Sequence, residues 1–375
     1  MLQLCPALMD WLLFLTMFAI LYGAGVRGFS PAQWTWLGVL MQITYLLGSL
    51  ATGHLLTPRS TRPLLLGSTV VSIALMAAAL WAQGFAVLAA LSAGIGLFAA
   101  VFFTAFQTFM RQVAPPDQLQ RVAGIYTCSW SIGAGLGFLS AGFLYNFGPA
   151  ALTALALLVG GAMLAILCSR HAPVQSVGAT EPDAGAAETA HVPEAVRRRY
   201  VWVGWALIFI VVFALRPVQT FLPPLGATAQ RSALLTTLPL FLQITLQGLA
   251  GYAMHTQTRW LYRRAPLVWL QVGAALVFVA LACAPSGAAL VGLPLIGLWC
   301  GYAYFQAVYY SSNAGRRAWN LGINEFLVGG AALLSLFAVE FFMKHTARPE
   351  TALYLCAAGS LLVAALALAW LAPRR

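Results

Sequence analysis

The sequence predicts an all-α membrane protein in which twelve transmembrane helices form two pseudo-symmetric six-helix bundles. Three observations lead to this prediction. First, 61% of the 375 residues are hydrophobic and only 8% are charged, whereas about 25% of the residues in a soluble globular chain are charged. Second, a spanning helix with its connection takes roughly 30 residues, so this length accommodates about twelve spans. Third, short stretches of the first half recur in the second half.

The composition also excludes other classes of protein. A soluble multidomain enzyme needs more polar surface, and a disordered or collagen-like chain needs far fewer apolar residues. The net charge of +11 does not indicate a nucleic-acid partner, because the arginines lie in short clusters between apolar runs, as is typical of loops at one membrane face. The six cysteines are scattered without metal-site spacing. No metal, cofactor or nucleic-acid partner is expected.

Twelve apolar runs define the expected spans, and turn signals such as Pro115-Pro116 and Pro223-Pro224 separate some of them. The first run has no basic residue before it, so we interpret it as a span and not as a signal peptide. Ser30-Pro31-Ala32-Gln33 has the pattern of a capping box that opens the second helix. The expected spans cover residues 8–27, 33–57, 63–82, 86–110, 121–145, 148–168, 200–222, 232–255, 265–284, 287–312, 318–343 and 351–371.

A polar stretch divides the chain into two halves. Residues 172–194 are rich in Ala, Pro, Gly and Thr and contain four of the nine acids, a composition typical of a flexible linker. Arg197-Arg198-Arg199 follows it. We therefore expect a six-helix bundle over 1–170, a cytoplasmic linker over 171–198 and a second six-helix bundle over 199–375.

The basic residues predict the orientation. With both termini in the cytoplasm, fifteen Lys and Arg lie inside and four lie outside, which leaves Arg216 within a span. Such a bias is typical of membrane proteins with this orientation. The prediction is an integral, multi-pass protein of the plasma (inner) membrane with both termini in the cytoplasm.

Internal repeats support the division into halves. Gln42-Ile43-Thr44 recurs as Gln243-Ile244-Thr245, and Ile95-Gly96-Leu97 recurs as Ile296-Gly297-Leu298, both 201 residues later. Two repeats at one offset, in corresponding spans, indicate a duplicated six-helix unit.

Two six-helix halves, a polar central loop and a basic loop after the second span resemble the major facilitator superfamily over the whole chain. The most specific point is the 121–145 span, which resembles the family's antiporter motif of spaced glycines. Small residues on one face let two helices approach closely, and generic small-residue packing is the alternative interpretation. By analogy with the family, we expect Gly133 and Gly137 to pack against the 232–255 span. The matching positions are Gly124, Gly133 and Gly137, then Phe138 in place of the motif's Pro, then Ala141-Gly142.

Other motifs of the family are incomplete. In the loop after the second span, only Gly53 and Arg62 remain of a glycine, acid and arginine pattern that holds the cytoplasmic gate in the family. The Arg that proton antiporters of the family often carry in the fourth span is absent, because Ala90 and Ser92 occupy the candidate positions. The 121–145 span therefore favours an exporter, whereas the fourth span argues against the best-known proton-coupled kind.

Charges within spans are costly and mark functional sites. Glu325 lies about eight residues into the 318–343 span, and we interpret it as a proton-titrating or cation-binding carboxylate; a gate residue paired with Arg316 or Arg317 is the alternative. Glu340 is expected to form a surface ion pair with Lys344. Asp10 is expected to have an interfacial or capping role at the cytoplasmic end of the first span.

Arg216 lies inside the 200–222 span and is followed by Pro217. Its guanidinium suits a bidentate contact to an anionic substrate group, and snorkelling to the outer surface is the alternative. Further polar and aromatic side chains within the spans are expected to face the interior, because amides in lipid need a partner. With Arg216 and Glu325 they form the candidate substrate site: Gln42, Tyr45, Gln107, Trp130, Gln243, Gln247, Gln306, Tyr309 and Asn324.

No nucleophile–base pair, phosphate-binding loop or pair of catalytic carboxylates is present in the sequence, so no enzyme is expected. The resemblance implies a monomeric secondary active transporter that moves a small organic solute by alternating access, with a preference for export and proton antiport. One alternative is a uniporter or symporter for an anionic metabolite. Another is a non-transporting membrane assembly factor with the same fold.

Overall fold

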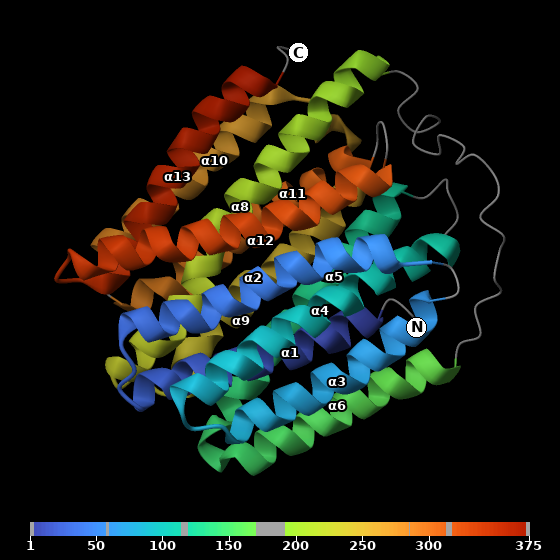
Figure 1. Cartoon of the computed structure of the whole chain (residues 1–375). Helices are drawn as coiled ribbons and strands as arrows, with labels where there is room; N and C mark the ends of the chain where they lie inside the picture. The colour runs from blue at the N-terminus through green and yellow to red at the C-terminus, as the bar shows by residue number, and fades with distance from the viewer. Residues whose placement is uncertain are drawn as a thin grey trace.

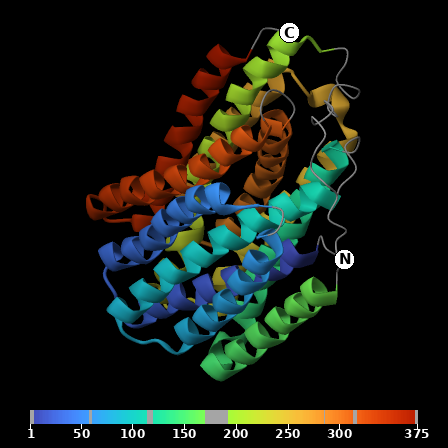
Figure 2. The ribbon, with the colours of Figure 1, turned by 45° about the vertical axis from the view of Figure 1, so that its right-hand side comes forward.

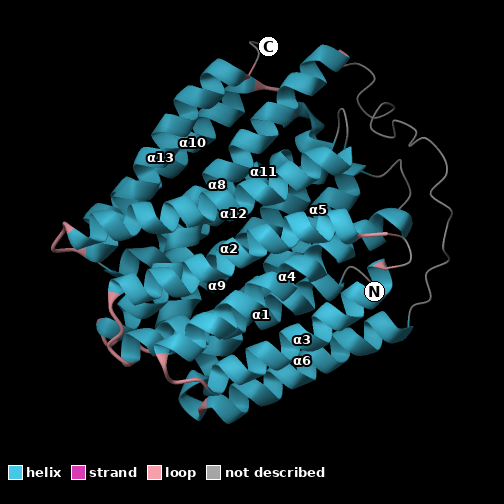
Figure 3. Ribbon diagram, in the orientation of Figure 1, coloured by secondary structure: helices cyan, strands magenta, loops and turns pink. Residues whose placement is uncertain are grey.

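The computed structural model describes residues 4–57, 60–113, 119–169, 192–284, 286–312 and 317–372. Every element in these ranges is helical (Figure 3). Twelve helices of the described chain are long and apolar enough to span a membrane, which confirms the predicted fold class. They are α1 (Leu4–Val26), α2 (Pro31–Leu55), α3 (Thr61–Trp81), α4 (Phe85–Val113), α5 (Leu119–Leu144), α6 (Pro149–Ser169), α8 (Glu194–Thr228), α9 (Ala233–Ala253), α10 (Arg264–Cys283), α11 (Ala289–Ser312), α12 (Arg317–Lys344) and α13 (Pro349–Leu371).

The helices of each half lie together, and the halves meet mainly along three helix pairs. Figure 1 shows α3 and α6 at one edge and α10 and α13 at the opposite edge. Between these edges α5 packs on α9, α2 on α12 and α1 on α8. The rotated view shows the first half, blue to green, beside the second half, yellow to red (Figure 2). These pairs surround the centre of the molecule.

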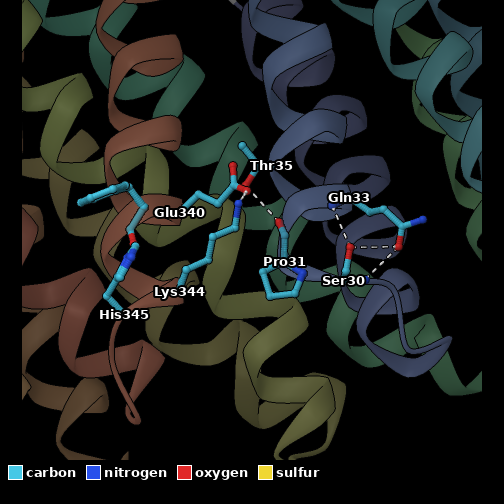
Figure 4. Close-up of polar contacts among 8 residues, drawn as sticks. Ser30, Pro31, Gln33, Thr35, Glu340, Lys344 and His345 are labelled. Atoms are coloured by element: carbon cyan, nitrogen blue, oxygen red, sulfur yellow. Dashed lines mark hydrogen bonds and ion pairs between the residues drawn. The ribbon is translucent and has the colours of Figure 1, made fainter.

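The start of α2 has the predicted capping box. The Ser30 hydroxyl accepts a hydrogen bond from the Gln33 amide at 3.3 Å, and the Ser30 amide donates to Gln33 Oε1 at 2.8 Å (Figure 4). Pro31 follows at the first helical position. Two amides that a helix start leaves without partners are thereby satisfied.

α8 is longer than the predicted 200–222 span. It runs from Glu194 to Thr228 and contains Pro217, Pro223 and Pro224, so the interpretation of Pro223-Pro224 as a break was wrong. The predicted linker also ends too late, because residues 194–198 belong to the helix, where Arg198 pairs with Glu194 at 2.6 Å. This pair supports the first turn. Residues 171–191 of the expected linker lie outside the described residues.

The two repeated tripeptides lie at equivalent helix crossings. A methyl group added to Gly96 of α4 would collide with the Met41 carbonyl of α2. One added to Gly297 of α11 would collide with the Gln243 carbonyl of α9. The same close crossing therefore occurs in both halves, and only glycine permits it. This packing explains why Ile-Gly-Leu recurs.

Polar contacts join the two halves at the end of the bundle where α1 and α8 end. The Tyr22 hydroxyl at the end of α1 donates to the Arg231 carbonyl at 2.6 Å. The Arg231 guanidinium pairs with Glu350 of α13 at 2.7 Å. Gly25 lies so close to Pro224 that a methyl group there would be 2.6 Å from the Pro224 carbonyl oxygen. α1 and α8 are thus packed tightly on this side.

Candidate functional site

A cavity of about 150 Å³ lies between the halves, bordered by α1, α2, α4, α5, α8, α11 and α12. Among its lining side chains are three charged groups, from α1, α8 and α12: Asp10, Arg216 and Glu325. Their convergence in one small space is the main feature of the site, because each charge is costly in the apolar interior of a membrane protein.

Asp10 belongs to this cavity, which corrects the expected capping role at the membrane surface. α1 begins at Leu4, so Asp10 is more than one turn inside the helix, and only 7% of its surface is exposed. Its carboxylate is attracted by Arg216 and repelled by Glu325. The signal was present in the sequence: an acid within an apolar run, as at Glu325. We overlooked it because we placed the start of the span too late.

Glu325 contacts the opposite half of the molecule. Its Oε2 accepts a hydrogen bond from the Tyr45 hydroxyl at 3.0 Å. Tyr45 belongs to α2 and Glu325 to α12, so this bond crosses the cavity between the halves. The alternative interpretation was an ion pair between Glu325 and Arg316 or Arg317 at the gate. It falls outside the described residues, because neither Arg316 nor the side chain of Arg317 is among them.

Arg216 lines the same cavity as Glu325, as the sequence predicted for both residues. Its guanidinium interacts electrostatically with Tyr304, Tyr45 and Asp10. Asp10 is the nearby acid. Within the described chain, the Arg216 guanidinium forms no hydrogen bond and no ion pair. Its N–H groups therefore remain available to an oxygen atom of a bound solute.

Uncharged side chains complete the lining. Gln42 and Asn324 are 3% exposed and both face the cavity. The Asn324 Oδ1 atom accepts no hydrogen bond from the described residues. Trp130 and Tyr304 pack edge to face, with ring centroids 5.2 Å apart. The lining thus combines an aromatic wall from α5 and α11 with amides from α2 and α12.

Four other predicted site residues are absent from the cavity lining. Gln243 donates to Gln247 Oε1 at 3.0 Å, and Gln247 donates to Ser131 of α5 at 3.2 Å. This chain joins α9 to α5 and is structural. Gln306 donates to the Trp260 carbonyl at 3.5 Å, and Tyr309 is buried and stacks on Phe305. The side chain of Gln107 lies outside the described residues.

The glycines of α5 face two different helices. A methyl group at Gly124 would lie 3.2 Å from His255 Cβ beyond the end of α9, and one at Gly142 would collide with Thr237 of α9. In contrast, Gly133 meets the Ala7 carbonyl, and a methyl group at Gly137 would be 2.6 Å from the Trp11 carbonyl oxygen. By analogy with the family we expected the 232–255 span as the partner of these two glycines. That expectation was wrong, because α1 is the helix that packs against them.

The remaining motif residues have simpler surroundings. A methyl group at Gly53 would meet nothing within 4 Å. Arg62 of α3 donates from Nη2 to the Cys168 carbonyl at the end of α6, at 3.4 Å. Arg62 therefore joins two helices of the first half.

Glu340 and Lys344 form the expected ion pair, 2.6 Å apart (Figure 4). The carboxylate is more buried than a surface pair implies, because only 9% of the Glu340 side chain is exposed, against 56% for Lys344. A buried acid on α12 therefore has a cationic partner at the C-terminal end of the helix. Glu325 lies on the same helix within the cavity.

Comparison with known proteins agrees with this architecture. A sequence profile described as Major Facilitator Superfamily matches residues 1–314, and the chain belongs to this family. The crystal structure of a point mutant of the nucleoside transporter NupG is similar, with a TM-score of 0.65, 13% identity, and coverage of 99% of this chain and 100% of that one. The crystal structure of the human organic anion transporter MFSD10 (TETRAN) has a TM-score of 0.70 and 15% identity, with 98% coverage of both chains. No curated protein sequence matches significantly.

The family and the twelve helices define the class of protein. The chain is an integral, multi-pass membrane protein with the fold of a secondary transporter. Proteins of this family bind small-molecule substrates within the lipid membrane. Because the sequence identity to these solved structures is low, the similarity shows a shared fold only.

Proposed function

We propose that this protein is a proton-coupled secondary active transporter of a small organic solute, working as a monomer in the plasma (inner) membrane. The observation that carries the proposal is the Tyr45–Glu325 hydrogen bond across a cavity that also holds Asp10 and Arg216. The residues up to 170 and those from 199 would move as two bundles around this cavity. The charged cluster would bind both the proton and the solute.

Proton binding at Glu325 changes the contacts between the halves. A carboxylate accepts the Tyr45 hydrogen bond and repels Asp10. A neutral carboxyl group no longer repels Asp10, and it carries a proton of its own to donate. The two protonation states therefore favour different arrangements of α2 and α12, which is the requirement for coupling a proton to alternating access.

The glycine-rich α5 supports export as the direction, in line with the resemblance to the antiporter motif. Gly133 and Gly137 hold α5 against α1, which carries Asp10, while Gly142 holds it against α9. α5 thus connects a charged helix of the first half to the second half. A rigid three-helix contact of this kind would transmit a change at Asp10 to the interface between the halves.

A ligand-stabilisation screen followed by flux measurement tests the proposal. Purified protein is heated with a panel of small solutes, since a ligand that binds the folded state raises the melting temperature. Each hit is then loaded into proteoliposomes, and its efflux is measured with and without a pH gradient. Gradient-driven flux of a stabilising solute supports the proposal. A stabilising solute whose flux ignores the gradient contradicts proton coupling, and the absence of any stabilising solute favours the assembly factor.

A second candidate function rests on Arg216. Its guanidinium faces the cavity without a hydrogen bond to the described residues, so it is suited to an anionic solute. The protein would then be a symporter or uniporter for an anionic metabolite. Stabilisation by carboxylates or phosphates, but not by their neutral esters or amides, distinguishes this function from the first.

Cysteine labelling tests the proposed orientation. Cys168 at the end of α6 and Cys283 at the end of α10 are both exposed, and the ends-inside topology places them on opposite sides of the membrane. We expect a membrane-impermeant maleimide added to intact cells to label Cys283 and to spare Cys168. Cys283→Ser and Cys168→Ser variants identify the signal. Labelling of Cys168 alone from outside would show that the topology is reversed.

A further inference from the structure

A second and larger hollow lies on the membrane-facing side of the second half. This crevice, of about 1050 Å³, is bordered by α8, α12 and α13. Several of its lining side chains are half or more exposed, among them Trp202, Phe342 and Val363. Because these side chains lie within membrane spans, the crevice opens to lipid.

The crevice is apolar along its whole length. On α13 its lining extends from Leu355 to Leu371, which is about 24 Å of helix axis at about 1.5 Å per residue. The hydrocarbon core of a bilayer is roughly 30 Å thick. The Ser360 hydroxyl donates to the Ala357 carbonyl at 2.7 Å, and the Trp205 indole donates to the Asn320 carbonyl at 3.1 Å. With these polar groups already bonded, the lining suits an acyl chain and not a polar solute.

Basic residues lie at the cytoplasmic end of the crevice. Arg199 Nε donates to the Leu371 carbonyl at 2.8 Å, and its Nη2 donates to the Trp370 carbonyl at 3.5 Å. Leu371 also lines the crevice, so the guanidinium is fixed at its mouth. Arg198 is exposed beside it. Arg199 has further N–H groups besides these two donors, and guanidinium N–H groups are suited to phosphate oxygens.

At the outer end of the crevice, Arg348 lies in the connection between α12 and α13, but within the described chain its side chain forms no hydrogen bond with a crevice-lining residue, unlike Arg199. Phe342 lines this end, and the nearby Lys344 is paired with Glu340 at 2.6 Å. An exposed Trp370, 79% accessible, lies at the cytoplasmic end beside Arg199, as is typical of side chains at the headgroup level. The charge of the crevice therefore favours a lipid of the cytoplasmic leaflet.

We propose that this crevice binds one anionic phospholipid of the cytoplasmic leaflet, with an acyl chain between α8, α12 and α13 and the phosphate at Arg199. The site is separate from the central cavity and does not depend on the transported solute. Anionic lipids are favoured because a cation near the membrane surface attracts them by about 1 kcal/mol, which is about fivefold in affinity.

Native mass spectrometry of the full-length protein tests the site. Delipidated protein is mixed with equal amounts of phosphatidylglycerol and phosphatidylcholine in detergent micelles. We expect one lipid to remain bound at activation energies that remove all others, with phosphatidylglycerol retained about fivefold over phosphatidylcholine.

Two variants fill the crevice without a clash. Gly359 lines it, and a methyl group there would meet nothing within 4 Å. Val363 lines it and is 67% exposed. Gly359→Leu and Val363→Trp should each lose the tightly bound lipid. The matched control is Gly273→Leu on α10, where a methyl group also meets nothing within 4 Å and which is absent from the crevice lining.

The headgroup contact is tested by Arg199→Gln. This variant should keep a bound lipid but lose the preference for phosphatidylglycerol over phosphatidylcholine. The site is refuted if both crevice-filling variants retain the tightly bound lipid at the wild-type level, or if Gly273→Leu loses it equally. An unchanged preference in the Arg199→Gln variant would refute the assignment of the phosphate.

Discussion

Two hollows lie on opposite faces of α12, and they differ in size and in charge. Asn324 and Glu325 line the central cavity of about 150 Å³. Ile323 and Leu327 line the lipid-facing crevice of about 1050 Å³. The larger hollow is apolar, whereas the smaller one collects two acids and an arginine. A choice by volume alone would therefore favour the lipid-facing crevice, whereas the charged side chains favour the central cavity as the candidate transport site.

The physical cost of each surface explains the difference. An apolar crevice that faces acyl chains carries no free-energy penalty, because lipid fills it. Asp10 and Glu325 are like charges in an apolar interior and repel each other, which is costly unless a proton or a cation such as Arg216 compensates. The charged cluster is energetically costly and has an alternative protonation state. It is therefore a better candidate functional site than the larger apolar crevice.

The largest expected effect comes from the packing around the two hollows. Gly137→Leu should push α5 away from α1, because a methyl group alone would be 2.6 Å from the Trp11 carbonyl oxygen. We expect loss of transport and about 1–3 kcal/mol of destabilisation, with some folded protein remaining. Gly359→Leu should fold normally. Flux in proteoliposomes measures the loss of transport, and size-exclusion chromatography measures the amount of folded protein. Normal transport by Gly137→Leu would contradict the close α1–α5 contact.

The next effect compares two acids on α12. Glu325→Gln should abolish the dependence of transport on the pH gradient, while exchange of substrate for substrate persists. A gradient of one pH unit supplies about 1.4 kcal/mol per proton, so the loss is about tenfold in accumulation. Glu340→Gln is the matched control, because Glu340 is an acid of the same helix that pairs with Lys344 outside the cavity. If Glu325→Gln retains full gradient-driven accumulation, Glu325 is a structural gate residue.

Much of the fold follows from the sequence, because each span must be apolar over its own length. The twelve spans, the capping box at Ser30 and the Glu340–Lys344 pair depend on residues close together in the chain, and the structure confirms all three. The length of α8 was not predictable from Pro223-Pro224, since neighbouring helices stabilise prolines in spanning helices.

The site was predicted only in part, because pairing between distant helices decides which polar groups face the cavity. Gln243 and Gln247 resembled ligand groups in the sequence, but their i, i+4 spacing lets the first donate to the second, which continues the chain to Ser131. Glu325 and Arg216 were predicted from the sequence because a charged side chain within a membrane span is energetically costly and marks a candidate functional site. Asp10 followed the same rule, but an error in the start of α1 concealed it.

A smaller effect concerns the selectivity of the central cavity. Arg216→Gln should weaken the binding of acidic solutes about tenfold or more, since a hydrogen bond to a charged group contributes about 1.5–3 kcal/mol. Neutral solutes should lose less. Arg216 also compensates Asp10, so the double variant Asp10→Asn/Arg216→Gln separates solute binding from charge balance. Ligand-induced shifts in melting temperature measure the binding of acidic and of neutral solutes. Equal losses of binding for the two kinds of solute would assign Arg216 a structural role.

The smallest expected effect lies far from both hollows, at the capping box of α2. Ser30→Ala removes the acceptor for the Gln33 amide and should cost about 1 kcal/mol, because that amide loses its partner. Transport and its pH dependence should not change, since the bond lies at the N-terminal end of α2 while Tyr45 lies deeper in the same helix. Hydrogen exchange at the start of α2 measures the loss, and Thr153→Ala, which removes a hydrogen bond from Trp81 on the outside of α6, is a control. Altered coupling in Ser30→Ala would show that the position of α2, and not only the charge of Glu325, controls the contact between the halves.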